Sequence, residues 1–361
     1  MALALSFTLA QLPLLGQAFF LHPHYRSTRN ARYIRLGLIP LTLAMLASFS
    51  SQWLVRDALD SFTNIFVGSF IALSGLRSVI WGTASDPYYL LADPNPSSSV
   101  FDRLLFAISL QSSPRGIGWS FGVPAKPVDQ TRFAFLLETL RRLAFNLPML
   151  VCSVILIGVI DSSSSAPSLG LRHLIAFFIG IQVWTMLDTA GCLVRLFALA
   201  FNLDLSKHPF FLDAPIKASS LADFWSRRWH SLAKHVFVEA GARPAQAIAR
   251  FFAGEGQFSR ASGILGAFLI SGLLHEFCLW FATWPDYTFR TTLFFTAQGL
   301  GVVLEAVFRR ATGLRVDGWL GRVWMLGWLV CWGRLMIDAW MEQNVVDKEA
   351  VRAYFLERGY L

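Results

Sequence analysis

The clearest candidates for chemistry are Ser271, His275 and Glu276, which stand inside the otherwise apolar stretch 262–284. An ionisable side chain at membrane depth is costly, so it indicates a function by default. Ser271 and His275 are four residues apart, and a helix places such residues on one face. Histidine titrates near neutral pH and can take a proton from a hydroxyl group. The spacing therefore favours His275 as a proton acceptor, and the alternative is a core histidine hydrogen-bonded to a neighbouring helix.

A second candidate segment is residues 224–230, with the sequence FWSRRWH. Guanidinium groups bind phosphates well, and Arg227, Arg228 and the nearby Lys234 could act in this way. Aromatic side chains are also typical of the lipid head-group region. The composition leaves two interpretations open, a membrane-surface anchor and an anion-binding element of an active site.

Other polar residues fall within apolar stretches. Gln298 and Glu305 are seven residues apart, share one helix face, and could line a polar cavity. The remaining groups are expected to join neighbouring helices or form local ion pairs. They are Arg77, Asp188, Arg195, Arg334 and Asp338.

Residues 118–122 read GWSFG and match the nucleophile motif of α/β-hydrolases. That motif works only on a sharp turn between a strand and a helix. No alternating strand pattern flanks Ser120, so the match is expected to be a coincidence.

The composition indicates which elements position these residues. The chain has 361 residues, of which 55% are apolar and 15% charged, with a mean hydropathy of +0.50. Soluble domains carry about 25% charged residues. The sequence excludes an ordinary soluble enzyme of this length and predicts an all-α, multi-pass membrane protein. Its net charge of +8 is attributed to cytosolic loops and not to nucleic-acid binding.

A membrane-spanning helix needs about 20 apolar residues, and about eight stretches qualify. The third is amphipathic and the weakest. The fifth is too long for one straight span, so it should tilt, break or run along the interface. The expected spans are 1–21, 36–54, 59–81, 143–160, 171–201, 262–284, 288–308 and 319–340.

Basic residues set the expected orientation, with both termini in the lumen. The loops assigned to the cytosol contain 21 of the 31 Lys and Arg, and they are 22–35, 82–142, 202–261 and 309–318. The expected organisation is a set of N-terminal transmembrane helices, 1–81, followed by a core domain, 82–361. No positively charged segment precedes the first apolar stretch, so it is expected to be a retained span.

The four cysteines all lie in apolar runs without a CxxC pair. They are expected to be small buried hydrophobes, not disulfides or metal ligands. No metal site is expected. The cysteines are Cys152, Cys192, Cys278 and Cys331.

Taken in order, these motifs resemble the wax-synthase-like branch of the membrane-bound O-acyltransferases. The resemblance is carried by FWSRRWH at 224–230 and by SGLLHE at 271–276. It extends to RGIGW at 115–119 and to FFTAQGLGVVLE at 294–305, and covers roughly residues 80–340. Fungal members of this branch include acetyltransferases of terpenoid and meroterpenoid pathways, and plant members make wax esters.

The resemblance implies an acyl-CoA-dependent O-acyltransferase in which the catalytic histidine is His275. Related sterol and diacylglycerol acyltransferases have a motif like FYxDWWN, and His230 stands where its asparagine would be. This departure leaves the role of His230 open. It could be a partner of His275, an orienting group or a donor to the acyl carbonyl, with Trp229 and Gln298 as alternative donors.

The implied co-substrate is acyl-CoA, with acetyl-CoA favoured, held by Arg227, Arg228, Trp229 and Lys234. The implied acceptor is a hydrophobic alcohol, a terpenoid or meroterpenoid hydroxyl, in the endoplasmic reticulum membrane. Alternatives are a long-chain wax ester or sterol ester synthase and, from other classes, a membrane transporter or a scaffold. The expected cavity residues are Ser271, Glu276, Gln298 and Trp225.

Overall fold

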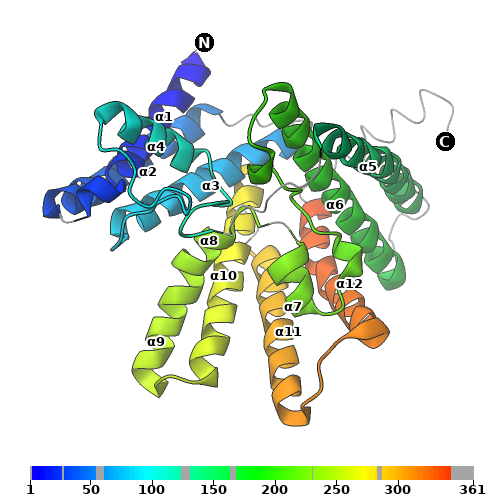
Figure 1. Cartoon of the computed structure of the whole chain (residues 1–361). Helices are drawn as coiled ribbons and strands as arrows, with labels where there is room; N and C mark the ends of the chain where they lie inside the picture. The colour runs from blue at the N-terminus through cyan, green and yellow to red at the C-terminus, as the bar shows by residue number, and fades with distance from the viewer. Residues whose placement is uncertain are drawn as a thin grey trace. The chain divides into compact units, whose positions relative to one another are not determined.

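A computed structural model describes residues 2–26, 28–53, 61–122, 131–162, 168–229, 231–282 and 287–342 (Figure 1). Within these ranges the chain forms helices and two isolated β-bridges, with no strand. The expected all-α class is confirmed.

The longer helices follow the apolar stretches of the sequence, and short 3₁₀ and π turns lie between them. The α-helices are α1 Ala2–Phe19, α2 Arg29–Trp53, α3 Ser61–Thr83, α4 Val100–Gln111, α5 Arg132–Ser162, α6 Leu169–Ala200, α7 Leu221–Asp223, α8 Lys234–Phe237, α9 Arg243–Ala253, α10 Gln257–Ala282, α11 Arg290–Thr312 and α12 Gly318–Glu342. The 3₁₀ turns are η1 Pro23–Tyr25, η3 Leu205–Lys207 and η4 Pro215–Lys217, and the π-helical turns are η5 Phe224–Arg228 and η6 Val238–Ala242.

Six helices in the described ranges are long and apolar enough to cross a membrane, namely α2, α3, α5, α6, α10 and α11. The chain is therefore a multi-pass membrane protein, as expected. The first and last of the eight expected spans are helical, as α1 and α12, but fall outside this set of six. Helix α12 carries four charged side chains, Arg322, Arg334, Asp338 and Glu342, which lower its mean hydropathy.

The helices differ from the expected segments in two places. Helix α5 begins at Arg132 and not near residue 143, and α4 also lies within 82–142, so much of that expected loop is helical. Helix α6 has 32 residues without interruption, which is about 48 Å at the usual rise. A break in this span is therefore excluded. The cytosolic placement of the loops and the domain division at residue 81 stay predictions.

The chain packs as two units that alternate along the sequence. The first contains residues 1–125 and 232–285, and the second contains 126–231 and 286–361. His275 therefore belongs to the first unit, and the segment 224–229 belongs to the second.

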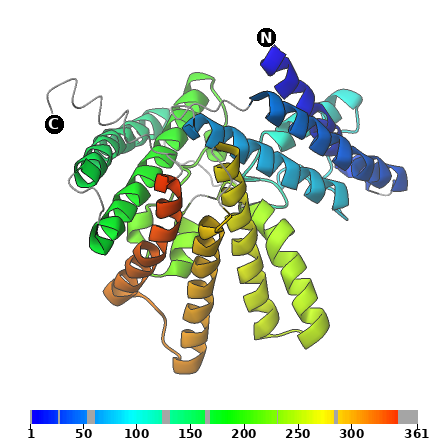
Figure 2. The same ribbon diagram turned by 180° about the vertical axis from the view of Figure 1, so that it is seen from behind.

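In the first unit, α1, α3 and α4 enclose a core around buried Leu14, Trp81, Phe106 and Trp119. Trp119 comes from the GWSFG loop, in which Gly116 and Gly118 have positive φ angles. Among residues 61–122 no strand flanks this loop, so the described part lacks the strand that the hydrolase motif requires. Helices α9 and α10 lie side by side as a hairpin (Figures 1 and 2).

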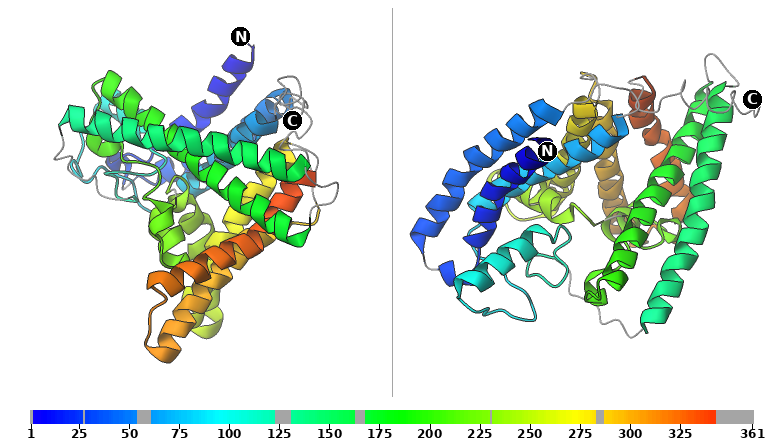
Figure 3. Two further views of the ribbon diagram at one scale, coloured as in Figure 1. Left: turned by 90° about the vertical axis from the view of Figure 1, so that its right-hand side faces the viewer. Right: turned by 90° about the horizontal axis from the view of Figure 1, so that it is seen from above.

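In the second unit, α5 and α6 pack against each other along much of their length (Figure 3). Helices α11 and α12 also pack together, and Leu221, Phe224 and Met325 form a core next to them. All four cysteines are free thiols. Cys192 and Cys278 are buried as expected, whereas Cys152 and Cys331 are exposed on α5 and α12.

Candidate functional site

His275 lies in the C-terminal half of α10. Its Nδ1 is 2.6 Å from the backbone carbonyl oxygen of Ser271, one helical turn earlier. A carbonyl oxygen only accepts, so Nδ1 must carry the proton, and the lone pair of the neutral ring then belongs to Nε2. This bond fixes both the ring orientation and the tautomer that a proton acceptor needs.

Close helix contacts hold α10 in place within the first unit. A Cβ atom on Gly241 would lie 2.4 Å from the carbonyl oxygen of Gly266, so these two backbones cross where only glycine fits. On the α3 side, a Cβ on Gly68 would lie 3.0 Å from the Phe281 ring. The hydroxyl of Ser69 is 3.2 Å from the Cys278 sulfur. These contacts fix the position of the helix that carries His275.

Ser271 and His275 share a face of α10, but they meet through the Ser271 carbonyl and not through its hydroxyl. Ser271 and Glu276 are both buried. Glu276 follows His275 directly, so its side chain leaves the helix about 100° away. It therefore lies on a different face from the histidine.

The second unit presents the FWSRRW segment as a short helix, α7, that continues into the π-helical turn η5. Glu305 of α11 fixes its start, because its carboxylate accepts the backbone N–H groups of Leu221 at 2.7 Å and Ala222 at 3.0 Å. It also accepts the indole N–H of Trp324 at 3.0 Å. Glu305 thus caps this helix instead of lining a polar cavity.

Asp223 pairs with both arginines of the segment. Its Oδ1 is 2.6 Å from Arg227 Nη2, and its Oδ2 is 2.7 Å from Arg228 Nε. Burial would raise the pKa of this carboxyl, but the hydrogen bonds and charges of Arg228 and Arg227 outweigh burial and lower the pKa. Asp223 is therefore ionised at neutral pH and offsets half of the charge of the arginine pair.

The two arginines differ in freedom. The Arg228 side chain is 22% exposed and also donates to the Asp213 carbonyl at 3.2 Å, while its own carbonyl accepts the Asp213 N–H. The Arg227 side chain is 72% exposed. Arg228 holds the local fold, and Arg227 is better able to reach an anion.

The aromatic residues of the segment form one cluster. The rings of Phe224 and Trp229 stack at 5.1 Å, and Trp225 packs edge-on against Phe224, Trp229 and Phe295 of α11. These contacts do not distinguish a membrane-surface anchor from an anion-binding element of an active site. They do explain the local spacing of the aromatic residues.

Gln298 lies on α11 and is completely buried. Neither its amide oxygen nor its amide nitrogen has a hydrogen-bond partner among the described residues. An orphaned buried polar group costs about 1–3 kcal/mol, so a residue kept in this state needs an explanation such as a ligand. Gln298 therefore stays a candidate for a cavity residue.

The other expected site residues are distributed as follows. His230 lies outside the described residues. Lys234 is the first residue of α8 and is exposed, in the first unit. Ser271, His275 and Glu276 belong to the first unit, whereas Trp225, Arg227, Arg228, Trp229 and Gln298 belong to the second.

His235 was not singled out from the sequence, yet it is embedded in the first unit. Its Nε2 is 3.3 Å from the Tyr88 hydroxyl, and its Nδ1 is 3.7 Å from a Glu239 carboxylate oxygen. Burial, helped by the charges of Arg77 and Arg243, lowers the pKa of His235 to about 4. It is therefore neutral at pH 7. In the sequence, the four-residue separation of His235 and Glu239 could have indicated this pair.

A known protein family is similar to the part of the chain that contains FWSRRWH and His275. Residues 208–297 match the sequence model of the membrane bound O-acyl transferase family. The segment includes FWSRRWH and His275, and it ends one residue before Gln298.

Several plant proteins are similar over a longer stretch. The chain is 26% identical to probable long-chain-alcohol O-fatty-acyltransferase 8 of Arabidopsis thaliana, over 55% of this chain and 57% of that protein. It is 29% identical to probable long-chain-alcohol O-fatty-acyltransferase 9 of the same plant, over 59% and 61%. It is also 29% identical to the long-chain-alcohol O-fatty-acyltransferase of Simmondsia chinensis, over 32% of each chain.

The chain spans about half the length of the first two of these relatives. The family match covers FWSRRWH at 224–230 and SGLLHE at 271–276, whereas RGIGW at 115–119, Gln298 and Glu305 lie outside it. Residues 208–297 are therefore similar to the membrane bound O-acyl transferase family.

Proposed function

We propose that this protein transfers an acyl group from acyl-CoA to the hydroxyl of an apolar alcohol, with His275 as the general base. One observation carries the proposal. The Nδ1–H of His275 is bound to the Ser271 carbonyl at 2.6 Å, which gives the ring the tautomer with a basic Nε2. The family match over residues 208–297 supports the same chemistry.

In the proposed reaction, Nε2 of His275 takes the proton of the acceptor hydroxyl as the oxygen attacks the thioester carbonyl. The tetrahedral intermediate then expels the CoA thiolate, which receives the proton from the imidazolium ring. Positioned proton transfer of this kind contributes about 10²–10⁴-fold to the rate. No covalent acyl-enzyme is required.

The oxyanion needs a hydrogen-bond donor aimed at it. We propose the amide group of Gln298, because its nitrogen is buried and has no partner among the described residues. His230 and the Trp229 indole are the alternatives suggested by the sequence.

For the CoA phosphates we propose Arg227, with Arg228 and Lys234 as further candidates. Arg227→Ala should raise the KM for acyl-CoA with little change in the KM for the alcohol. Arg228→Ala should instead lower the amount of folded protein, because it removes contacts to Asp223 and Asp213. An acyl-CoA KM that is unchanged in Arg227→Ala would exclude Arg227 from donor binding.

The relatives are named for long-chain alcohols and fatty acyl groups, which supports a wax ester type of reaction. The resemblance to fungal enzymes instead suggests acetyl-CoA and a terpenoid or meroterpenoid acceptor, and a sterol ester is a further possibility. We place the fatty acyl donor first because it accords with the names of the relatives. We propose the endoplasmic reticulum as the membrane.

A donor series separates these alternatives. Membranes containing the protein are incubated with hexadecanol, a sterol or a terpenoid alcohol and with acyl-CoA donors from acetyl to palmitoyl. Ester formation that rises with donor length supports the wax ester reaction, and a maximum at acetyl-CoA supports terpenoid acetylation. An absence of ester for every pair, with folded protein in the membrane, would overturn the proposed function.

A further inference from the structure

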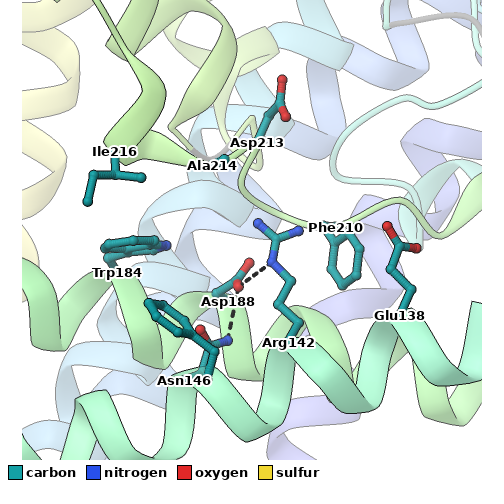
Figure 4. Close-up of a pocket in the computed structure, with 10 residues that line it drawn as sticks. Glu138, Arg142, Asn146, Trp184, Asp188, Phe210, Asp213, Ala214 and Ile216 are labelled. Carbon is teal, nitrogen blue, oxygen red and sulfur yellow. Dashed lines mark hydrogen bonds and ion pairs between the residues drawn. The ribbon is translucent and has the colours of Figure 1, made fainter.

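The second unit contains a pocket of about 320 Å³ that the proposed reaction does not use. It lies between α5, α6 and the chain segment 210–216 (Figure 4). Its lining combines charged groups with aromatic and aliphatic side chains. The lining residues are Glu138, Arg142, Phe145, Asn146, Trp184, Asp188, Phe210, Asp213, Ala214 and Ile216.

The charges around this pocket disfavour an anion. Three carboxylates line it, those of Glu138, Asp188 and Asp213, and Arg142 is the one cation among the lining residues. Arg142 is already engaged, since its Nε is 2.7 Å from Asp188 Oδ2 and its Nη2 donates to the Leu212 carbonyl at 2.8 Å. Glu138 is also paired, since its Oε2 is 2.9 Å from Arg195 Nη2. The Asp213 carboxylate is the charge that remains unpaired among these lining residues, and it favours a cation over the phosphates of CoA.

Buried acceptor atoms in the pocket are left without donors. The Asp188 side chain is 1% exposed, and its Oδ2 accepts both Arg142 and the Asn146 amide N–H. The other oxygen, Oδ1, has no partner among the described residues, and neither has the Asn146 Oδ1. Figure 4 shows these side chains together with the Trp184 ring. The indole N–H of Trp184 also has no partner among the described residues. Because orphaned polar groups are costly, the pocket is suited to a ligand that carries N–H donors for the two oxygens and an acceptor for the indole.

The surroundings of the pocket favour a ligand with an apolar tail. Phe145 lines the pocket and is itself exposed on α5, a helix apolar enough to cross a membrane. Cys152 and Leu156 follow Phe145 on the same face of this helix and are also exposed, so a lipid chain could lie along them.

We propose that this pocket binds the protonated primary amine of a long-chain amphiphile. The ammonium group supplies three donors, which match the Asp188 and Asn146 oxygens, and its charge is balanced by the Asp213 carboxylate. The aromatic rings of Trp184 and Phe145 pack against the adjoining methylene groups. An aminophospholipid and a free long-chain amine both carry this chemistry.

Binding to the purified full-length protein in detergent tests the proposal by native mass spectrometry. The probes are phosphatidylethanolamine, phosphatidylcholine with the same acyl chains, hexadecylamine and hexadecanol. Retention of phosphatidylethanolamine alone identifies a phospholipid site, and retention of hexadecylamine identifies a site for simple long-chain amines. Equal retention of phosphatidylcholine and phosphatidylethanolamine, together with equal retention of hexadecanol and hexadecylamine, would overturn the proposal.

The Asp188→Asn variant should weaken binding of the retained amine by roughly tenfold to a hundredfold, because a charge-assisted hydrogen bond is lost. Asp213→Asn removes a carboxylate at the pocket while leaving its backbone bonds to Arg228 possible, and should also weaken binding. If Asp188→Asn does not fold, Asp213→Asn is the variant that tests the proposal. Asp204→Asn is the matched control, since Asp204 lies outside the pocket beside Ser206 and Lys207.

Unchanged amine binding in folded Asp188→Asn or, where that variant fails to fold, in Asp213→Asn, would contradict the assignment. His275→Ala should bind the amine as the wild type does. The pocket and the proposed acyl transfer can therefore fail independently.

Discussion

The cap that Glu305 places on the FWSRRW segment leads to a sharp prediction. Replacing Glu305 by alanine removes the acceptor for three donors, the N–H groups of Leu221 and Ala222 and the indole N–H of Trp324. Each donor orphaned in a buried site costs about 1–3 kcal/mol. Because such costs are not fully additive, we expect a total loss of about 3–6 kcal/mol.

Glutamine has the same shape but retains one acceptor oxygen. In Glu305→Gln that oxygen can keep the bonds to Leu221 and Trp324, while the new amide group faces the Ala222 N–H. The expected loss is then that of one hydrogen bond, about 1–3 kcal/mol. The predicted order of stability is wild type, then Glu305→Gln, then Glu305→Ala.

Thermal unfolding in detergent and the KM for acyl-CoA measure this order. As the unfolding temperature falls from wild type to Glu305→Gln to Glu305→Ala, the KM for acyl-CoA should rise, because the cap positions the segment that carries Arg227 and Arg228. Glu255→Ala is the matched control, since the Glu255 side chain is 83% exposed and its pairing with Arg250 is a surface contact, worth about 1 kcal/mol or less. The reasoning would be refuted if Glu305→Ala unfolded at the wild-type temperature.

Three further predictions concern other parts of the molecule. Gly241→Val should destabilise the first unit by about 1–3 kcal/mol or more, since a Cβ at Gly241 meets the Gly266 carbonyl at 2.4 Å. Gly37→Ala, where nothing lies within 4 Å, should be tolerated in the same unfolding assay. Because burial lowers the pKa of His235 to about 4, its unfolded form binds the proton first. Stability should therefore fall as the pH drops from about 6.5 towards 4, and His235→Gln should flatten this decline. Gln298→Leu should keep or raise the unfolding temperature because it removes an orphaned amide, while kcat falls; an unchanged kcat would remove Gln298 from the proposed site.

Features encoded by neighbours in the sequence could be predicted. The four-residue separation of Ser271 and His275 correctly predicted that they share one face of a helix, because helix geometry alone determines which residues share a face. Arg334 and Asp338 likewise form the i, i+4 pair that their spacing suggested, at 3.8 Å. The apolar stretches indicated helices for the same reason.

Partners on other helices could not be predicted in this way. Asp188 and Arg195 lie on one helix in the sequence, yet Asp188 pairs with Arg142, and Arg195 pairs with Glu138 at 2.9 Å, both from α5. The packing of α5 against α6 determines these ion pairs, and the spacing of residues along α6 alone does not predict them. The pocket lined by Asn146 and Asp188 depends on the same packing.

The cap on the FWSRRW segment was missed for a similar reason. Glu305 and Leu221 are 84 residues apart, so nothing local connects them, and the sequence suggested only that Glu305 could line a polar cavity. Asp223 was closer to being predictable. It stands four residues before Arg227, a spacing at which opposite charges meet on a helix.

The central claim is that His275 supplies the base for acyl transfer. The most direct measurement is the rate of ester formation by His275→Ala in membranes, with the donor and alcohol on which the wild type is most active. Its folding is checked by the unfolding temperature. The account predicts a loss of about 10²-fold or more in kcat with the protein still folded. An ester yield equal to that of the wild type would contradict it.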